Sequence, residues 1–288
     1  MIGLGKSKRR RRATILGSGS SGGVPRIGGV DGRGNWGACD PNEPKNRRTR
    51  CSLLVEQSDA EGGFGRNDVT SVLIDTSPDM REQLLKAQVA RLDAVLITHD
   101  HADQTHGVDD LRALAIEHRR QVPVYVEPRS GGGIVDRFRY CFEQAEGSWY
   151  PAILQRMDLS ETGAPAEIDG PGGVMSFTPF LQLHGQVTSL GFRIGDLAYS
   201  SDVVDLPDAS FEALDGVKIW IVDALQMTPH GSHAHFEKTL SWIERVRPER
   251  AILTNLHVSM DYQTVKGLCP DGVEPGYDGL SIDFAASA

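Results

Sequence analysis

The sequence predicts an α/β fold, because apolar runs typical of buried strands alternate along the chain with segments of helical spacing. Residues 94–97, 217–222 and 251–254 are apolar runs of the length of a strand. Residues 108–119 and 236–246 place apolar side chains three and four positions apart, as an amphipathic helix does. A histidine or an aspartate lies one to three positions after each of the three strand-like runs, so we expect polar side chains to gather at one edge of a sheet.

The first half of the chain contains five predicted strands, at residues 13–16, 51–56, 70–75, 93–98 and 123–127. A helix is expected from Ser77, as its N-cap, to about residue 90, because Pro78 suits a first helical turn. The glycine-rich residues 17–25 either cradle a phosphate with backbone amides or form a tight structural loop. Residues 28–50 are polar and aperiodic, which predicts a long loop.

The second half repeats this pattern, with predicted strands at residues 174–183, 189–194, 197–200, 217–222 and 251–254. Gly195 and Asp196 separate two of these strands and indicate a hairpin turn. A short helix is expected at residues 211–214 and a longer one at 236–246.

Composition limits the class of protein. With 288 residues, 39% of them hydrophobic, we expect one domain over residues 13–288, preceded by a disordered basic tail over residues 1–12. The net charge of −9 argues against a stable nucleic-acid partner. No apolar run has the ~20 residues of a membrane span, no signal core follows the basic residues, and four cysteines are too few for a disulfide framework. We therefore expect a soluble cytoplasmic protein without a membrane partner.

Residues 98–107 carry the strongest chemical signal, the sequence Thr-His-Asp-His-Ala-Asp-Gln-Thr-His-Gly after the strand at 93–98. In an extended segment, residues two apart point the same way, so His99, His101 and Asp103 can converge on one point. Imidazole nitrogens and a carboxylate are suitable ligands for a borderline divalent metal. The alternative interpretation is a polar, solvated loop.

This stretch resembles the His-x-His-x-Asp-His signature of the metallo-β-lactamase fold hydrolases, with Gln104 in place of the last histidine. The resemblance covers about residues 13–262 and implies a four-layer αββα sandwich holding two divalent ions, zinc or manganese. The carboxylate of Asp75 matches the structural carboxylate that the family has beside its metal loop. The implied ligands are His99, His101 and His184 for the first ion, Asp103 and His257 for the second, Asp202 bridging both, and Gln104 as a doubtful ligand.

Two such ions about 3.5–4 Å apart lower the pKa of a water between them and neutralise charge on phosphoryl oxygens. Asp103 can hold the resulting hydroxide as well as a metal, and a leaving alkoxide then needs a proton. Residues 229–233 are similar to the histidine segment of ribonuclease Z and of the phosphonate-pathway cyclic-phosphate phosphodiesterases. We expect His233 to donate the proton, with His235 as the second candidate; the alternative is a cluster of caps at a helix start.

Three further residues are predicted to bind substrate: Ser20 in the glycine-rich loop, Arg112 and His230. The alternative for Arg112 is an ion pair within its helix.

The expected function is a phosphodiesterase that cleaves a small cyclic or nucleotide-like phosphodiester by metal-bound hydroxide. One alternative is a non-catalytic metal- or nucleotide-binding protein, since Gln104 removes a ligand. Another is a cofactor-biosynthesis protein, because the glycine-rich loop is similar to that of pyrroloquinoline-quinone-biosynthesis protein B. A thioesterase-type hydrolase of the same fold is the third. The resemblance also makes a homodimer an expected assembly.

Overall fold

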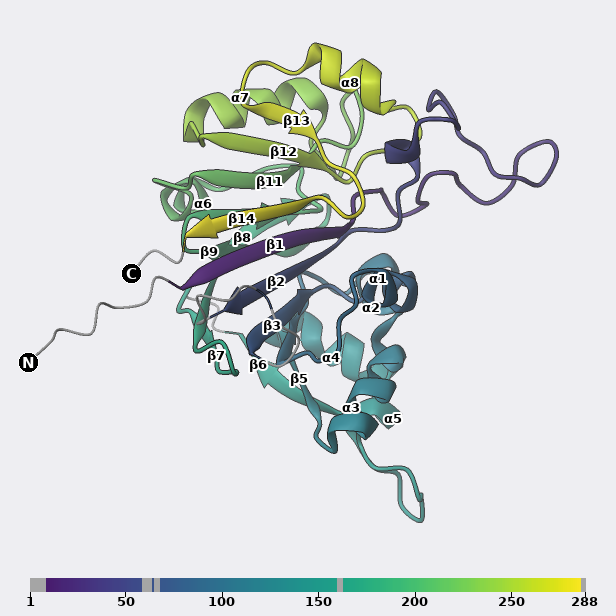
Figure 1. Ribbon diagram of the computed structural model, residues 1–288, viewed down its shortest axis with the longest axis vertical. Coiled ribbons are helices and arrows are strands. Elements are labelled where there is room, and N and C mark those ends of the chain that lie inside the picture. Colours follow the sequence, from purple (N-terminus) through teal and green to yellow (C-terminus); the bar gives the residue numbers. More distant parts are fainter. Residues whose placement is uncertain (1–8, 59–63, 65–67, 160–162, 286–288) are drawn as a thin grey trace, which may run out of the picture.

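The computed structural model describes residues 9–58, 64, 68–159 and 163–285. In this part of the chain, two seven-stranded β-sheets pack face to face, and helices cover both outer faces (Figure 1). This confirms the predicted four-layer αββα sandwich. Among these residues, no helix has the length and apolar character needed to cross a bilayer.

The first sheet combines the N-terminal strands with the last strand of the chain. Its order is β14 (Ser281–Ala285), β1 (Arg10–Gly17), β2 (Ser52–Ser58), β3 (Val69–Ile74), β4 (Ala94–Leu96), β5 (Val122–Val126) and β6 (Leu154–Asp158). The pairs β1–β14, β1–β2 and β2–β3 are antiparallel, and β3 to β6 run parallel. In Figure 1, β14 lies along β1 at the seam between the two sheets.

The second sheet has the order β13 (Val273–Pro275), β12 (Arg250–Thr254), β11 (Ile219–Asp223), β10 (Leu197–Ser200), β9 (Val187–Ile194), β8 (Met175–His184) and β7 (Ala166–Ile168). The strands β10 to β13 are parallel, whereas β7 to β10 form antiparallel pairs. The hairpin predicted between β9 and β10 is present.

Both faces of each sheet are buried. In β2, Leu53 and Val55 face the core between the sheets, and Leu54 faces the outer helices. In β11, Ile221 faces the same central core and Trp220 faces the opposite helical layer. This explains why the strands read as continuous apolar runs in the sequence rather than as alternating ones.

The helices divide between the two outer faces (Figure 1). Those beside the first sheet are α1 (Met80–Lys86), α2 (Ala102–Thr105), α3 (Arg112–His118), α4 (Pro128–Arg137) and α5 (Arg139–Phe142). Those beside the second are α6 (Asp208–Ala213), α7 (Phe236–Val246) and α8 (Tyr262–Leu268). The chain also has two short 3₁₀ helices, η1 (Pro44–Asn46) and η2 (Val108–Leu111), in the part that the structure describes.

Three predicted helices differ from the structure, and the short helix expected at residues 211–214 is α6, which spans Asp208–Ala213. The first begins at Met80 rather than at Ser77, whose hydroxyl accepts a hydrogen bond from the Asp79 amide within the preceding turn. The helix predicted at residues 108–119 is divided into η2 and α3. In contrast, α7 has the bounds that its apolar spacing predicts.

The predicted tail boundary is also wrong, because β1 begins at Arg10 and includes three arginines that we assigned to a disordered segment. Arg11 is buried and donates to the Gln57 side chain, while Arg12 pairs with Asp283 of β14. Three consecutive arginines can therefore belong to this strand, because the side chain of each has a partner on a neighbouring strand. Residues 1–8 of the predicted tail lie outside the described residues.

The glycine-rich loop of residues 17–25 packs tightly against the end of the long loop. A Cβ atom on Gly17 would lie 1.9 Å from the Arg50 carbonyl oxygen, and one on Gly19 would lie 2.9 Å from the Arg48 Cβ. This close backbone approach requires glycine. This packing agrees with the interpretation of residues 17–25 as a tight structural loop.

Candidate metal centre

The candidate site is built from the ends of strands in both sheets. His99 follows β4, His184 is the last residue of β8, and Asp202 follows β10. Asp223 ends β11 and Asn255 follows β12. Because β10, β11 and β12 are parallel neighbours, their carboxyl ends meet at the same edge of the sheet.

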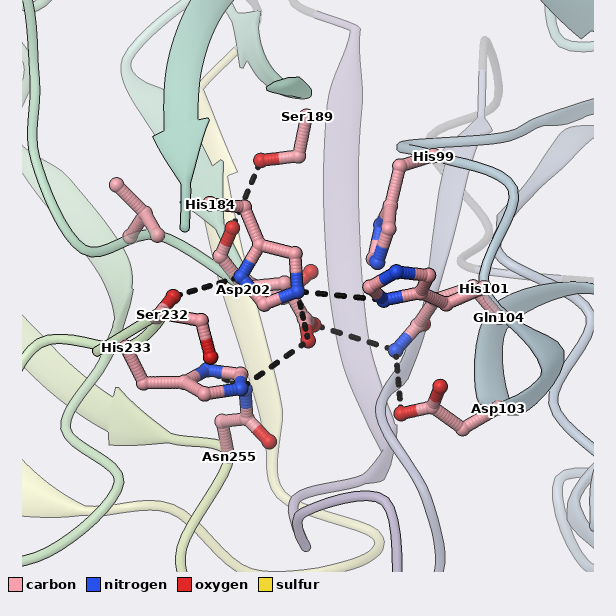
Figure 2. Close-up of polar contacts among 12 residues, drawn as sticks. His99, His101, Asp103, Gln104, His184, Ser189, Asp202, Ser232, His233 and Asn255 are labelled. Carbon is pink, nitrogen blue, oxygen red and sulfur yellow. Dashed lines mark hydrogen bonds and ion pairs between the residues drawn. The ribbon is translucent and has the colours of Figure 1, made fainter. Parts of the chain in front are cut away.

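Three of the predicted ligands, His99, His101 and His184, form a compact group (Figure 2). Their ring centroids are 4.5 Å apart for His99 and His101, 4.9 Å for His99 and His184, and 5.1 Å for His101 and His184. Each offers a nitrogen within 4.8 Å of the others. His184 also belongs to a second group with Asp202 and His233.

Hydrogen bonds fix the orientation of His99. Asp75 accepts hydrogen bonds from the Thr98 amide, at 2.8 Å, and from the Thr98 hydroxyl, at 2.9 Å. With that hydroxyl donating to the Asp75 carboxylate, its oxygen accepts from Nδ1 of His99, 3.0 Å away. The remaining ring nitrogen, Nε2, then carries a lone pair, as a metal ligand must. Asp75 thus has the structural role predicted for it.

His184 is oriented in the same way. Its Nδ1 donates to the Ser232 carbonyl oxygen at 2.6 Å, which leaves Nε2 to face the cluster. Burial lowers the pKa of His99 well below its ordinary value, and burial together with the neighbouring His233 and His101 lowers the pKa of His184 to about 4. Both rings are therefore neutral at pH 7, which is the ligating form of imidazole.

These residues fit one divalent ion. Nε2 of His99 is buried and has no hydrogen-bond partner among the described residues, an arrangement that is costly for a polar atom unless a ligand satisfies it. Three imidazole nitrogens with a carboxylate nearby, Asp202, form a donor set suited to zinc. The first predicted ion therefore has a complete set of protein ligands.

Asp202 is buried beside this group, and its pKa is raised, first because burial disfavours the charged form and then because Asp103 and Asp223 are also negative. One of its oxygens lies 3.9 Å from Nε2 of His184, and the other accepts a hydrogen bond of 3.2 Å from the Gln104 amide nitrogen. The same nitrogen donates to Asp103, also at 3.2 Å (Figure 2). Gln104 therefore links the two carboxylates predicted to share the second ion.

His233 faces the cluster from the second sheet. Its Nδ1 donates to the buried Asp223 carboxylate at 2.8 Å, and its Nε2 lies 3.9 Å from Asp202 (Figure 2). Burial alone would lower the pKa of His233, but the charge and hydrogen bond of Asp223, with the charges of Asp202 and Asp103, outweigh it and raise the pKa to about 9. His233 therefore carries a proton at neutral pH.

The other candidate histidines lie outside this group. His257 is only partly buried, and its Nδ1 is hydrogen-bonded to Ser259 at 2.9 Å. His257 belongs to neither of the two groups, and its role as a metal ligand stays a prediction. His235 is the residue before α7, and His230 is exposed, with its ring centroid 5.3 Å from that of His233. Roles for these two histidines stay predictions.

Two predicted substrate-binding residues have different surroundings. The Ser20 hydroxyl is buried and, within the described part of the chain, has no hydrogen-bond partner. Arg112 donates to Asp109 at 2.5 Å and lies over the Tyr140 ring, which is the ion-pair alternative considered for it.

Sequence reasoning missed two residues of the site, Asp223 and Asn255. The amide nitrogen of Asn255 lies 3.2 Å from Nδ1 of His233 (Figure 2). It also lies 3.4 Å from Asp223. Both residues stand at the ends of apolar runs, which is the criterion that selected Asp202. Applying it to β11 and β12 as well identifies them.

Three residues beside the site, Asp75, Asp202 and Asn255, have left-handed backbone conformations, with φ of 65°, 51° and 62°. Asp75 and Asn255 follow directly after a strand, Asp202 lies two residues after β10, and none of the three is glycine. Such conformations are unfavourable for most side chains and persist where the surrounding structure holds them. The backbone turns at these positions aim each polar group toward its partners at the site.

A cavity of about 580 Å³ lies near the cluster, and none of the proposed metal ligands is among its lining residues. Its wall includes Thr98, which is hydrogen-bonded to His99, and Ser189, which donates to the Asp202 carbonyl. Apolar side chains, among them Phe180 and Leu190, form much of the remaining wall. The volume is in the range of small-molecule sites, which is about 300–1,000 Å³.

Comparison with known proteins identifies relatives of this chain. Residues 70–255 match the sequence profile of the beta-lactamase superfamily domain. A solved diphosphatase from the PhnP family is 30% identical, with a TM-score of 0.81, over 97% of this chain and 99% of that chain. Zinc-bound PqqB from Methylobacterium extorquens has a TM-score of 0.70 at 15% identity, over 95% of this chain and 100% of that chain, which shows a shared fold.

A curated octanoyltransferase of Porphyromonas gingivalis (strain ATCC BAA-308 / W83) is 33% identical to this chain over 272 residues. The match covers 93% of this chain and 51% of the relative. The chain thus spans about half the length of that protein.

Proposed function

Because this chain belongs to the beta-lactamase superfamily, and to its PhnP-related branch, we propose that it is a metal-dependent phosphodiesterase for a small cyclic or nucleotide-like phosphodiester. The observation that carries the proposal is the juxtaposition of a three-histidine cation site with the His233–Asp223 pair. The first can bind a cation, and the second can supply a proton to a leaving group.

The protein's own residues would hold the ion. His99, His101 and His184 would be its ligands, with Asp202 beside them. A divalent ion bound there, zinc or manganese, supplies Lewis-acid catalysis and a water of lowered pKa. Thr98 and Asp75 keep Nε2 of His99 directed at the ion. The Ser232 carbonyl does the same for His184.

His233 is proposed to be the general acid. Its Nδ1–H is held by Asp223, so the proton available for transfer is the one on Nε2, which faces Asp202 and the cluster. Hydrolysis of a phosphodiester expels one of its alcohol groups as an alkoxide, and this leaving group needs a proton in the transition state. Asp223 positions the ring and stabilises its positive charge.

Charge favours a small substrate. The net charge of −9 disfavours a polynucleotide. The diphosphatase relative of the PhnP family supports phosphate-ester chemistry. A cytoplasmic location belongs to the same proposal, because all four cysteines are free thiols, as in reducing compartments.

The test is hydrolysis by protein loaded separately with zinc and with manganese. Substrates are bis(p-nitrophenyl) phosphate, a panel of cyclic nucleotides and an acyl thioester. We expect phosphodiester hydrolysis that EDTA abolishes, that added metal restores, and that the His101→Ala variant lacks. If only the thioester is hydrolysed, this proposal fails and the protein is a thioesterase. An absence of turnover with metal bound would favour the non-catalytic alternative.

A further inference from the structure

We infer that the centre binds one divalent ion, because side-chain amides occupy the positions from which the second ion would be held. This inference rests on the proposed function for the identity of the first site. It contradicts our expectation of two ions, and its evidence is a separate set of contacts around Gln104, Asn255 and His257.

Gln104 is the first obstacle to a second ion. The side chain is 1% exposed, and its amide nitrogen donates to Asp103 and Asp202, each at 3.2 Å. These are the two carboxylates that a second ion would share. An amide N–H group carries no lone pair for a metal, so the hydrogen bonds and an ion exclude each other at this position. The amide has the linking role that an ion would otherwise have.

Asn255 is the second obstacle. It follows β12, at the sheet edge where β10 and β11 present Asp202 and Asp223. The strand end at this edge therefore presents an amide instead of an imidazole. Its nitrogen lies 3.4 Å from the Asp223 carboxylate, which already accepts from His233. Nδ1 of the nearby His257 accepts a hydrogen bond of 3.2 Å from the Ser259 amide, so the proton of the neutral ring lies on Nε2 and neither nitrogen has a free lone pair.

The donors left for a second ion are therefore poor. If Gln104 rotated to present its oxygen, the set would be two carboxylates and one amide oxygen, with no imidazole. Zinc prefers nitrogen and sulfur ligands, whereas an all-oxygen set suits magnesium or manganese. The test must therefore use manganese as well as zinc.

The experiment measures metal content after equilibrium dialysis against zinc or manganese, with folding checked by circular dichroism. We expect about one equivalent of either metal per native chain. The electron paramagnetic resonance spectrum of the manganese protein should have the hyperfine pattern of an isolated ion. About two equivalents, or a spectrum broadened by coupled ions, would overturn the inference and leave the proposed hydrolase intact. A chain that binds neither metal would contradict both.

Variants test whether these amides are the cause. The double change Gln104→His with Asn255→His should raise zinc content from about one to about two equivalents. The matched control is Gln121→His, which adds an imidazole at an exposed position just before β5. The control should stay at about one equivalent. If the folded double variant also stays there, the inference fails, because other features then exclude the second ion.

Discussion

His233 is held from one side by Asp223 and faces Asp202 with its other nitrogen. The ring is thus both oriented and kept positive by buried carboxylates. This arrangement separates two tasks at the residue scale: the histidine cluster binds the cation, and a residue that need not bind it carries the proton.

We predict that His233→Ala lowers kcat by about 10²–10⁴-fold, the usual contribution of a general acid. Zinc content should not change, because His99, His101 and His184 all remain. Steady-state kinetics with parallel metal analysis measures both quantities. His118→Ala is the control, since His118 is exposed at the end of α3. Unchanged kcat in His233→Ala would exclude the acid role.

Thr98 acts through another residue. Thr98→Val keeps the side-chain shape but removes the hydroxyl that connects Asp75 to His99. We expect zinc affinity to fall about 10–100-fold, as it does when outer ligand contacts are removed. Competition with a chromophoric chelator measures this. Thr98→Ser retains the hydroxyl and should bind zinc as the native chain does; equal affinity in both variants would disprove the connection.

Among the contacts between elements, Asp261 attaches the long loop of residues 28–50 to α8. Its carboxylate accepts hydrogen bonds from the Asp40 amide, the Asn46 side chain and, as N-cap, the Thr264 amide. Burial would raise the pKa of Asp261, but these hydrogen bonds outweigh it and lower the pKa to about 2. Asp261 is therefore one of several contacts that hold this loop, and it acts in its ionised form.

We predict that Asp261→Ala lowers the free energy of unfolding at neutral pH by about 0.5–2 kcal/mol, the usual effect of losing an N-cap. Because the folded pKa lies below the ordinary value of 3.8, the stabilisation is present above that value and is lost as the pH falls toward about 2. Urea titrations with EDTA present, at pH 6 and pH 3, should show the difference between the two proteins shrinking. A constant difference would contradict this account.

Much of the element order could be predicted from the sequence, because strands buried on both faces leave long apolar runs. The start of α1 could not, since the hydroxyl of Ser77 bonds within the preceding turn instead of capping the helix. The sequence predicted that the site residues stand just after the ends of strands. Whether Asn255 or His257 faces the centre depends on the left-handed turn at Asn255, which no spacing rule reveals.

At the scale of the whole molecule, the cation site joins the two sheets. His99 and His101 come from the loop after β4 of the first sheet, and His184 ends β8 of the second. An ion bound to all three is a link between the two layers that the unfolded chain cannot form. Metal binding should therefore stabilise the whole fold.

We predict that zinc raises the melting temperature and that EDTA reverses the change. A ligand that binds only the native state adds about 2.7 kcal/mol of stability at 100 times its Kd. Thermal melts at several zinc concentrations measure the shift. His184→Ala should remove most of the shift, because it removes the ligand from the second sheet. A full shift in this variant would place the bound zinc elsewhere.

The pairing of β14 with β1 has a consequence for synthesis. Residues 281–285 complete the edge of the sheet that begins with residues 10–14. A nascent chain therefore carries an open β1 edge while residues 15–280 are translated, and unpaired edges of this kind are templates for aggregation. Emergence of residues 281–285, rather than of the first strands, is the step that completes this sheet.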